Sequence, residues 1–211
     1  MNKKTDPPTL DFEQILWQSG LRYVAGFDEA GRGALAGPVA VGAVVLPPDP
    51  QLARTLDGVR DSKQMTRQQR ETWAERLKSV ALAWQVKFSS AEEIDRFGIV
   101  WATRLAASRA LEKLEILPDY LLLDFRLDLP EASIPQTAIV KGDQLSLSIA
   151  AASVLAKTSR DALMCVMDTK YPGYGLKQNK GYGTLTHRYA LAHRGYSPFH
   201  RKSFTIKGLT E

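Results

Sequence analysis

The sequence is almost without cysteine: Cys165 is the only one in 211 residues. A single cysteine excludes an internal disulfide, and with it the framework of a small disulfide-rich secreted domain. Cys165 lies in an apolar helical stretch, so we expect a buried, inert thiol rather than a nucleophile. No serine with a nearby base is evident either, which disfavours a mechanism through a covalent intermediate.

Long apolar runs are also missing. No stretch approaches the roughly 18 to 20 residues that span a bilayer, and no apolar segment of a secretory signal follows the first lysines. We therefore expect a cytoplasmic protein with no membrane partner. Hydrophobic residues make up 44% of the chain and charged residues 24%, which is ordinary for a globular protein of one domain.

Acidic residues are absent from one long segment, which runs from Thr169 to Thr210. The same segment holds eight Lys or Arg, all three histidines and seven aromatic residues, and the whole chain carries a formal net charge of +5. Basic side chains neutralise phosphates, and aromatic rings stack on sugars or bases. The segment therefore favours a nucleic-acid partner; the alternative is a helix and tail with a solvated basic face.

Strand-like runs alternate with helical patterns along the chain. We expect strands at 23–27, 38–46, 82–88, 120–123 and 137–141, and helices at 11–19, 66–80, 90–98, 99–115, 145–168 and 184–193. Thr66 with Gln69, and Ser90 with Glu93, have the spacing of helix capping boxes. The alanine-rich centre of the longest helix would permit close packing on a sheet.

These elements predict an α/β fold with helices packed on a mixed sheet. Residues 1–20 are expected to form a partly flexible N-terminal extension. Residues 21–211 are expected to form one domain, which includes the basic and aromatic segment at about 169–207.

Four carboxylates stand where sheet-based sites form. Asp28 and Glu29 end the first strand, Asp124 ends another apolar strand, and Asp143 stands at the start of a helix. Carboxylate oxygens are preferred ligands of Mg²⁺ and Mn²⁺, and clustered carboxylates cannot all ionise without a cation. Two metal ions about 3.5 to 4 Å apart can activate water and stabilise the leaving oxygen in phosphodiester hydrolysis.

Each of these acids also has a purely structural interpretation. Asp143 could be a helix N-cap, Asp124 could close a turn, and Asp28 with Glu29 could be solvated charges at a strand end. Spacing alone leaves the four-carboxylate metal site a hypothesis.

Five sequence blocks stand out along the chain: Ala25–Gly33 with Ala36–Val39, Asp61–Lys63, Lys141–Asp143 with Ile149–Lys157 and Arg160–Asp161, Lys180–Thr184 with His187, and Ser197–Phe204. In this order they resemble the signatures of the ribonuclease HII family. The resemblance implies a ribonuclease H-like fold, with a mixed five-stranded sheet flanked by helices and a helical, basic C-terminal segment. Type HIII relatives carry a further N-terminal domain, and only 27 residues precede Asp28 here, so we expect type HII.

The resemblance also implies an activity. A metal-dependent endonuclease of this kind hydrolyses the RNA strand of RNA–DNA hybrids and incises 5′ of single ribonucleotides embedded in duplex DNA, leaving 3′-hydroxyl and 5′-phosphate ends. By the same resemblance Asp28, Glu29, Asp124 and Asp143 are catalytic ligands of two Mg²⁺ or Mn²⁺ ions. Nothing in the sequence demands a second copy, and we expect a monomer.

Substrate contacts follow from the same motifs. The turn of Gly31, Arg32 and Gly33 is expected to bring its backbone against the ribose 2′-hydroxyl, because glycines allow close approach and this hydroxyl distinguishes RNA from DNA. Tyr182 is expected to sense the adjoining deoxyribose. Arg32 and Lys63 are candidate phosphate contacts.

One position departs from the family pattern. The family usually has glycine after the third acid, whereas Phe125 follows Asp124 here, and phenylalanine resists a positive φ. Asp128 is a competing ligand four residues on. We choose Asp124 because it directly ends the apolar strand.

Two rival functions remain at this point. Gly31, Gly33 and Gly37 after a strand are similar to a dinucleotide-binding loop, but the spacing is one residue too long and Pro38 starts a strand instead of a helix. The second rival is a non-catalytic nucleic-acid-binding module on the same fold. The presence of all four acids argues against it.

Overall fold

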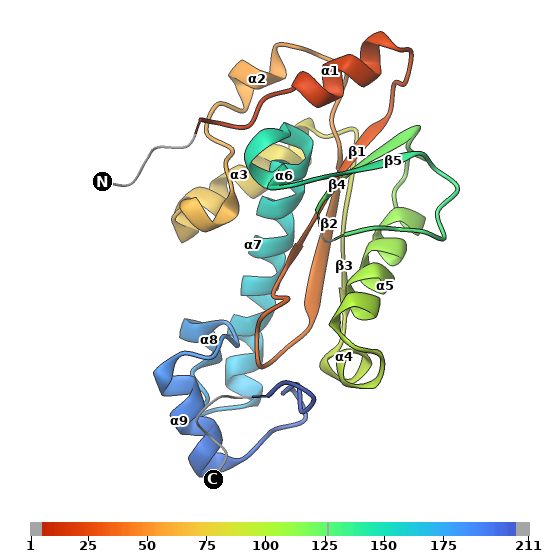
Figure 1. The fold of residues 1–211 in the computed structure, drawn as a ribbon. Helices are drawn as coiled ribbons and strands as arrows, with labels where there is room; N and C mark the ends of the chain where they lie inside the picture. The colour runs from red at the N-terminus through yellow and green to blue at the C-terminus, as the bar shows by residue number, and fades with distance from the viewer. Residues whose placement is uncertain (1–5, 126, 206–211) are drawn as a thin grey trace.

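The computed structural model describes residues 6–125 and 127–205, so the outermost parts of the predicted extension and of the basic segment lie outside the described residues. One mixed sheet has the strand order β3-β2-β1-β4-β5 (Figure 1). Its strands are β1 (Val24–Ala30), β2 (Val39–Val45), β3 (Ala83–Ser89), β4 (Tyr120–Asp124) and β5 (Gln136–Ile139). The predicted mixed five-stranded sheet is confirmed.

Strand directions place the carboxyl ends of two strands together. β1 pairs antiparallel with β2, and β2 with β3, whereas β1 with β4 and β4 with β5 are parallel. The glycine-bearing turn after β1 therefore leads into an antiparallel neighbour and not into a helix. This arrangement excludes the dinucleotide-binding loop.

The helices cover both faces of the sheet. They are α1 (Asp11–Gln18), α2 (Leu52–Thr55), the 3₁₀ turn η1 (Ser62–Gln64), α3 (Arg67–Val80), α4 (Ala91–Phe97), α5 (Ile99–Glu112), α6 (Gly142–Leu145), α7 (Leu147–Lys170), α8 (Leu176–Asn179) and α9 (Leu185–Arg194). The capping boxes at Thr66 and Ser90 both form as predicted. No helix within residues 6–125 and 127–205 is long and apolar enough to cross a membrane.

Helix α7 lies directly on the sheet, opposite α5 (Figure 1). Its close approach depends on two glycines of the strands. A Cβ at Gly26 would lie 2.2 Å from the backbone carbon of Ser148, and a Cβ at Gly42 would lie 2.3 Å from the carbonyl oxygen of Ala152. The close packing expected from the alanine-rich helix centre is therefore confirmed.

Helix α1 is anchored to the start of α7 by a buried carboxylate. Oε1 of Glu13 accepts hydrogen bonds from Oγ of Ser146 at 2.6 Å and from the backbone N–H of Ser148 at 2.9 Å. The predicted helix at 11–19 is thereby fixed next to the segment that carries α6. At the opposite end of α7, helices α8 and α9 form a lobe that packs against the turn after β1 (Figure 1).

Candidate active site

Three of the four predicted acids converge at the carboxyl ends of β1 and β4. In the parallel pair, Phe27 stands opposite Leu123, so the acids that follow them are neighbours across the sheet. One carboxylate oxygen from each of Asp28, Glu29 and Asp124 lies within 4.8 Å of the other two. Strand β1 runs one residue past Glu29, to Ala30, so the two acids lie inside the strand and do not end it.

Asp28 is the most buried member of this cluster. Burial, followed by the negative charges of Glu29 and Asp124, raises the pKa of Asp28 well above its usual value, while a hydrogen bond from Ser153 opposes the shift. Its Oδ1 accepts the backbone N–H of Glu29 at 2.7 Å. The site therefore penalises the ionised carboxylate that metal binding requires, unless a cation is present.

Glu29 supplies a second sign that the cluster is built around a cation. Burial raises its pKa, and Arg32, 3.9 Å away, only partly offsets this. Its Oε2 is buried and has no hydrogen-bond partner among the described residues. Oxygen-only donors, mutual repulsion and an unpartnered buried oxygen fit a hard divalent cation such as Mg²⁺ or Mn²⁺.

Asp143 lies at the margin of the three-acid cluster. It belongs to the short helix α6, and Ser146, not Asp143, caps the long helix α7. Asp143 stands at the start of a helix, as predicted, but that helix is the short α6; the long helix expected from 145 begins at Leu147. Oδ1 of Asp124 accepts the backbone N–H of Gly142 at 2.8 Å, which ties α6 to the cluster. Burial and the charge of Asp61 raise the pKa of Asp143.

The competing acid points elsewhere. Asp128 accepts a hydrogen bond at 3.0 Å from Nε of Arg104, on the outside of α5. Phe125 is exposed, and among the described residues a positive φ outside glycine occurs only at Lys141 and Lys180. The backbone after Asp124 therefore does not need the conformation that phenylalanine resists.

A cleft of about 540 Å³ opens above the acids. It brings together eight of the nine predicted site residues, all except Asp143, and the remaining lining residues are Ala30, Ser62, Arg70 and Lys157. Asp143 connects with this cleft through Lys63, whose Nζ lies 3.3 Å from its Oδ2. The Lys63 side chain is 76% exposed and is therefore available to an incoming phosphate.

The glycine turn at the cleft wall is held from behind. Gly31 has φ +87°, and a Cβ there would collide with the side chain of Arg160, whereas a Cβ at Gly33 would meet nothing within 4 Å. Arg201 donates to the carbonyl oxygens of Gly31 and Arg32, both at 2.8 Å. The turn is thus fixed on its inner side and open toward the cleft.

Arg160 and Arg201 are functional residues that the sequence reasoning missed. Both are fully buried, and burial, with the positive charge of Arg160, lowers the pKa of Arg201 to about 9. Both lie in the recognised sequence blocks, but arginines in a basic region suggest phosphate contact. Nothing local indicated that they would bind backbone carbonyls instead.

Tyr182 lines the same cleft as the acids and is fixed at its backbone. The carbonyl oxygen of Tyr182 lies 2.9 Å from Nδ1 of His187, whose Nε2 lies 3.0 Å from Nε2 of His200. A carbonyl only accepts, so Nδ1 of His187 carries a proton. Nδ1 of His200 accepts the backbone N–H of Ser197 at 3.1 Å, so the proton of His200 is on Nε2 and is donated to Nε2 of His187. Both imidazoles are consequently neutral.

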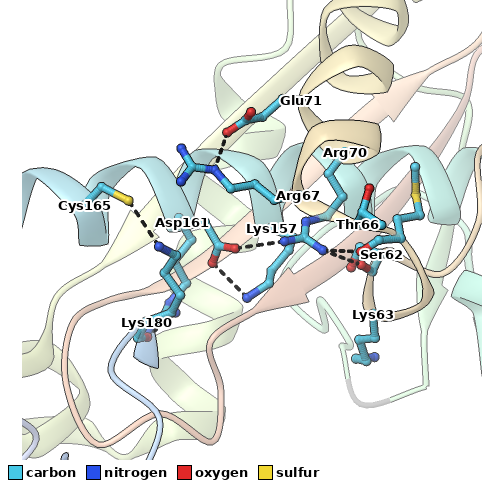
Figure 2. A network of polar contacts seen from close by, with 12 residues as sticks. Ser62, Lys63, Thr66, Arg67, Arg70, Glu71, Lys157, Asp161, Cys165 and Lys180 are labelled. Carbon is cyan, nitrogen blue, oxygen red and sulfur yellow. Dashed lines mark hydrogen bonds and ion pairs between the residues drawn. The ribbon is translucent and has the colours of Figure 1, made fainter. Parts of the chain in front are cut away.

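Cys165 differs from the expectation of a buried, inert thiol. It is half-buried, and Nζ of Lys180 lies 3.1 Å from its Sγ (Figure 2). Helix α7 presents this position toward the lobe instead of toward the sheet. The apolar sequence around Cys165 could not distinguish these two faces.

Known proteins match this chain over nearly its whole length. The family model described as Ribonuclease HII matches residues 25–207. The Ribonuclease HII of Synechococcus sp. (strain JA-3-3Ab) is 54% identical over 203 residues, which span 95% of this chain and 90% of that protein. The Ribonuclease HII of Dehalococcoides mccartyi (strain ATCC BAA-2266 / KCTC 15142 / 195) is 47% identical over 197 residues, 91% of this chain and 90% of that one.

Solved structures show the same architecture. The crystal structure of the ribonuclease H2 from Pyrococcus horikoshii OT3 has a TM-score of 0.73 and 27% identity, and the match covers 86% of this chain and 93% of that one. The RNase HII in a PCNA complex from Archaeoglobus fulgidus has a TM-score of 0.71 and 25% identity, over 85% and 92% of the two chains.

Proposed function

The chain belongs to the ribonuclease HII family of ribonuclease H hydrolases, and on this basis we propose that it cuts RNA–DNA hybrids and also DNA containing single ribonucleotides. It hydrolyses the RNA strand of a hybrid and incises 5′ of one ribonucleotide embedded in duplex DNA. The products carry 3′-hydroxyl and 5′-phosphate ends. The cluster of Asp28, Glu29 and Asp124 in the floor of the cleft carries the proposal.

The acids are proposed to hold two divalent ions, Mg²⁺ or Mn²⁺. Asp28, Glu29 and Asp124 form the centre of the set, and Asp143 joins from α6. Bound ions supply the positive charge that activates water and stabilises the leaving oxygen. The raised pKa values of Asp28 and Glu29 and the unpartnered Oε2 of Glu29 support this assignment, because each disfavours the cluster without a cation.

The turn of Gly31, Arg32 and Gly33 is proposed to recognise the ribose. Its backbone faces the cleft beside Glu29, and Arg201 already satisfies the carbonyls on its inner side. A 2′-hydroxyl can therefore approach the open side without displacing a protein hydrogen bond. A preorganised turn of this kind spends little free energy on ordering itself when substrate binds.

Tyr182 is proposed to pack against the deoxyribose that follows the ribonucleotide, where an added hydroxyl would be unfavourable. It lies in the same cleft as the acids and the glycine turn. Arg32 and Lys63 contact phosphates, and the basic segment at 169–207 extends the electrostatic contact with the duplex. The protein acts as a monomer in this proposal.

One experiment tests the proposal directly. The protein is incubated with duplex DNA containing one ribonucleotide, and separately with an all-RNA hybrid, in Mg²⁺, in Mn²⁺ and with a chelator. Metal-dependent incision 5′ of the ribonucleotide, with 3′-hydroxyl ends, is expected. If both substrates bind equally with and without metal and stay intact, the protein is a binding module instead.

A further inference from the structure

A buried carboxylate outside the metal cluster lies between two cations that line the cleft. Asp161, on α7, is nearly buried; its Oδ1 lies 2.8 Å from Nζ of Lys157 and its Oδ2 lies 3.3 Å from Nη2 of Arg70 (Figure 2). Neither Arg70 nor Lys157 has a place in the proposed function so far. Asp161 itself does not line the cleft.

The contact between Asp161 and Arg70 connects Asp161 to the side of the cleft where the acids lie. Nη1 of Arg70 donates to the carbonyl oxygens of Ser62 at 3.1 Å and Met65 at 2.6 Å, on either side of Lys63. Oγ of Ser62 lies 2.9 Å from Oγ of Ser153. Arg70 therefore fixes the η1 turn that presents Lys63 to Asp143.

The contact between Asp161 and Lys157 connects Asp161 to the part of the cleft wall that holds Tyr182. Nζ of Lys157 lies over the Tyr182 ring, 5.3 Å from its centroid, in a cation–π contact. Lys157 and Asp161 are four residues apart on one helix, so the carboxylate restrains the lysine from the adjacent turn. One anion thus orients both the η1 turn and the cation beside Tyr182.

Removal of this anion would release one of the two cations. Arg70 would keep its hydrogen bonds to the carbonyl oxygens of Ser62 and Met65, whereas Lys157, repelled by Arg70 and no longer paired, would be free to turn into the cleft. Lys157 would then leave the Tyr182 ring. The ring would keep the guanidinium of Arg160, 5.5 Å from its centroid, but would lose one of the two cations that restrain it.

We propose that Asp161 is a positioning residue for junction specificity, which acts by holding Lys157 against Tyr182. The inference rests on the proposed function, in which Tyr182 packs against a deoxyribose. Asp161 touches no substrate; it makes Tyr182 rigid enough to distinguish a deoxyribose from a ribose. Arg70, the other cation paired with Asp161, supports cleavage of every substrate equally because it holds the η1 turn beside the acids.

The test measures kcat/KM on a single-ribonucleotide duplex and on an all-RNA hybrid, and uses the ratio of the two. This ratio does not depend on the fraction of folded enzyme, so a partly unfolded variant remains informative. Asp161→Asn is expected to lower the ratio about fivefold, a typical size for coupling between contacting residues. Lys157→Gln is expected to lower it similarly, whereas Arg70→Gln should reduce both rates and leave the ratio unchanged.

A double-mutant cycle identifies the route of the effect. Tyr182→Ala should lower the ratio by itself, and adding Asp161→Asn to it should lower the ratio no further. Asp168→Asn, two turns along α7 and outside the cleft, is the charge-matched control and should leave the ratio as in the wild type. An unchanged ratio in Asp161→Asn, or an equal drop with and without the Tyr182 ring, overturns the inference.

Measurement of the wild-type protein distinguishes failure of the role proposed for Tyr182 from failure of the role proposed for Asp161. If the wild type shows no preference for the junction, the role proposed for Tyr182 fails, and the positioning role of Asp161 fails with it. If the wild type shows the preference and Asp161→Asn retains it, only the inference about Asp161 is wrong.

Discussion

At the scale of single residues, burial has opposite consequences for the acids and for the histidines of this site. Asp28 is buried among like charges, so burial favours its protonated form. His200 is buried as a neutral ring, so burial favours its deprotonated form. Each side chain therefore contributes to activity or to structure in one protonation state, and each state can be tested separately.

Asp28→Asn should abolish cleavage and spare substrate binding, because it removes a metal ligand and no phosphate contact. Without metal it should also raise the melting temperature by a few degrees, since it removes a buried charge that Glu29 and Asp124 repel. Calorimetry in chelator and a filter-binding assay measure both effects. Asp143→Asn should likewise lose cleavage with binding intact; a parallel loss of affinity would contradict the ligand role.

The His200 pair predicts a loss of stability in mild acid. Burial, followed by the neighbouring His187, lowers the pKa of His200 to about 4, whereas an unfolded histidine titrates near its usual 6.5. Between these pH values the unfolded chain binds the extra proton, so stability falls as the pH drops from about 6.5 to about 4, by on the order of 3 kcal/mol. Urea unfolding across this range measures it.

His200→Gln is the matched control for that prediction. A glutamine amide can still donate toward His187 and accept from Ser197, but it does not titrate. The stability of this variant should depend less on pH between 6.5 and 4. An identical slope in both proteins would assign the effect to other groups.

At the scale of elements, local signals predicted the helices that have local causes. Thr66 and Ser90 begin helices by hydrogen bonds within three residues, and these could be anticipated from spacing alone. The short elements η1, α2 and α8 were missed because three or four residues show no period. The same limit hid α6, which occupies one turn before α7 begins, so the long helix starts at Leu147 and not at 145 as expected.

Replacement by alanine is expected to affect stability at Gly26 but not at Gly33. Gly26→Ala should destabilise the protein by about 1 to 3 kcal/mol or more, because its Cβ would lie 2.2 Å from the backbone of α7. Gly33→Ala should leave stability unchanged, because its Cβ meets nothing, but should reduce cleavage at a ribonucleotide. Thermal unfolding and kcat/KM separate the two. A stable Gly26→Ala protein would mean that α7 does not depend on this close approach.

At the scale of the whole molecule, the mixed five-stranded sheet and the convergence of Asp28, Glu29 and Asp124 could be anticipated, because strand ends in a parallel pair meet at one edge. The support for the glycine turn could not, because Arg201 reaches it from a distant part of the sequence. Composition indicated that the basic segment meets phosphate. It did not indicate that one of these arginines is fully buried and bound to carbonyl oxygens.

The exposed part of that basic segment predicts salt-sensitive binding. Affinity for a hybrid duplex should fall linearly with the logarithm of salt concentration, and Lys177→Gln should make the slope shallower by about one unit if Lys177 contacts a phosphate. Lys113→Gln, an exposed lysine at the end of α5, is the control and should leave the slope unchanged. A flat salt profile in the wild type would remove electrostatics from substrate binding.

Arg201 stands 170 residues after Gly31, the residue whose carbonyl oxygen it binds. During synthesis on the ribosome, the strands that carry the carboxylates are therefore translated long before the side chain that holds the turn of Gly31 to Gly33. A growing chain can assemble its metal-binding acids while the turn is still unsupported. If the turn recognises the ribose as proposed, selectivity for the substrate is acquired last, when Arg201 reaches the turn.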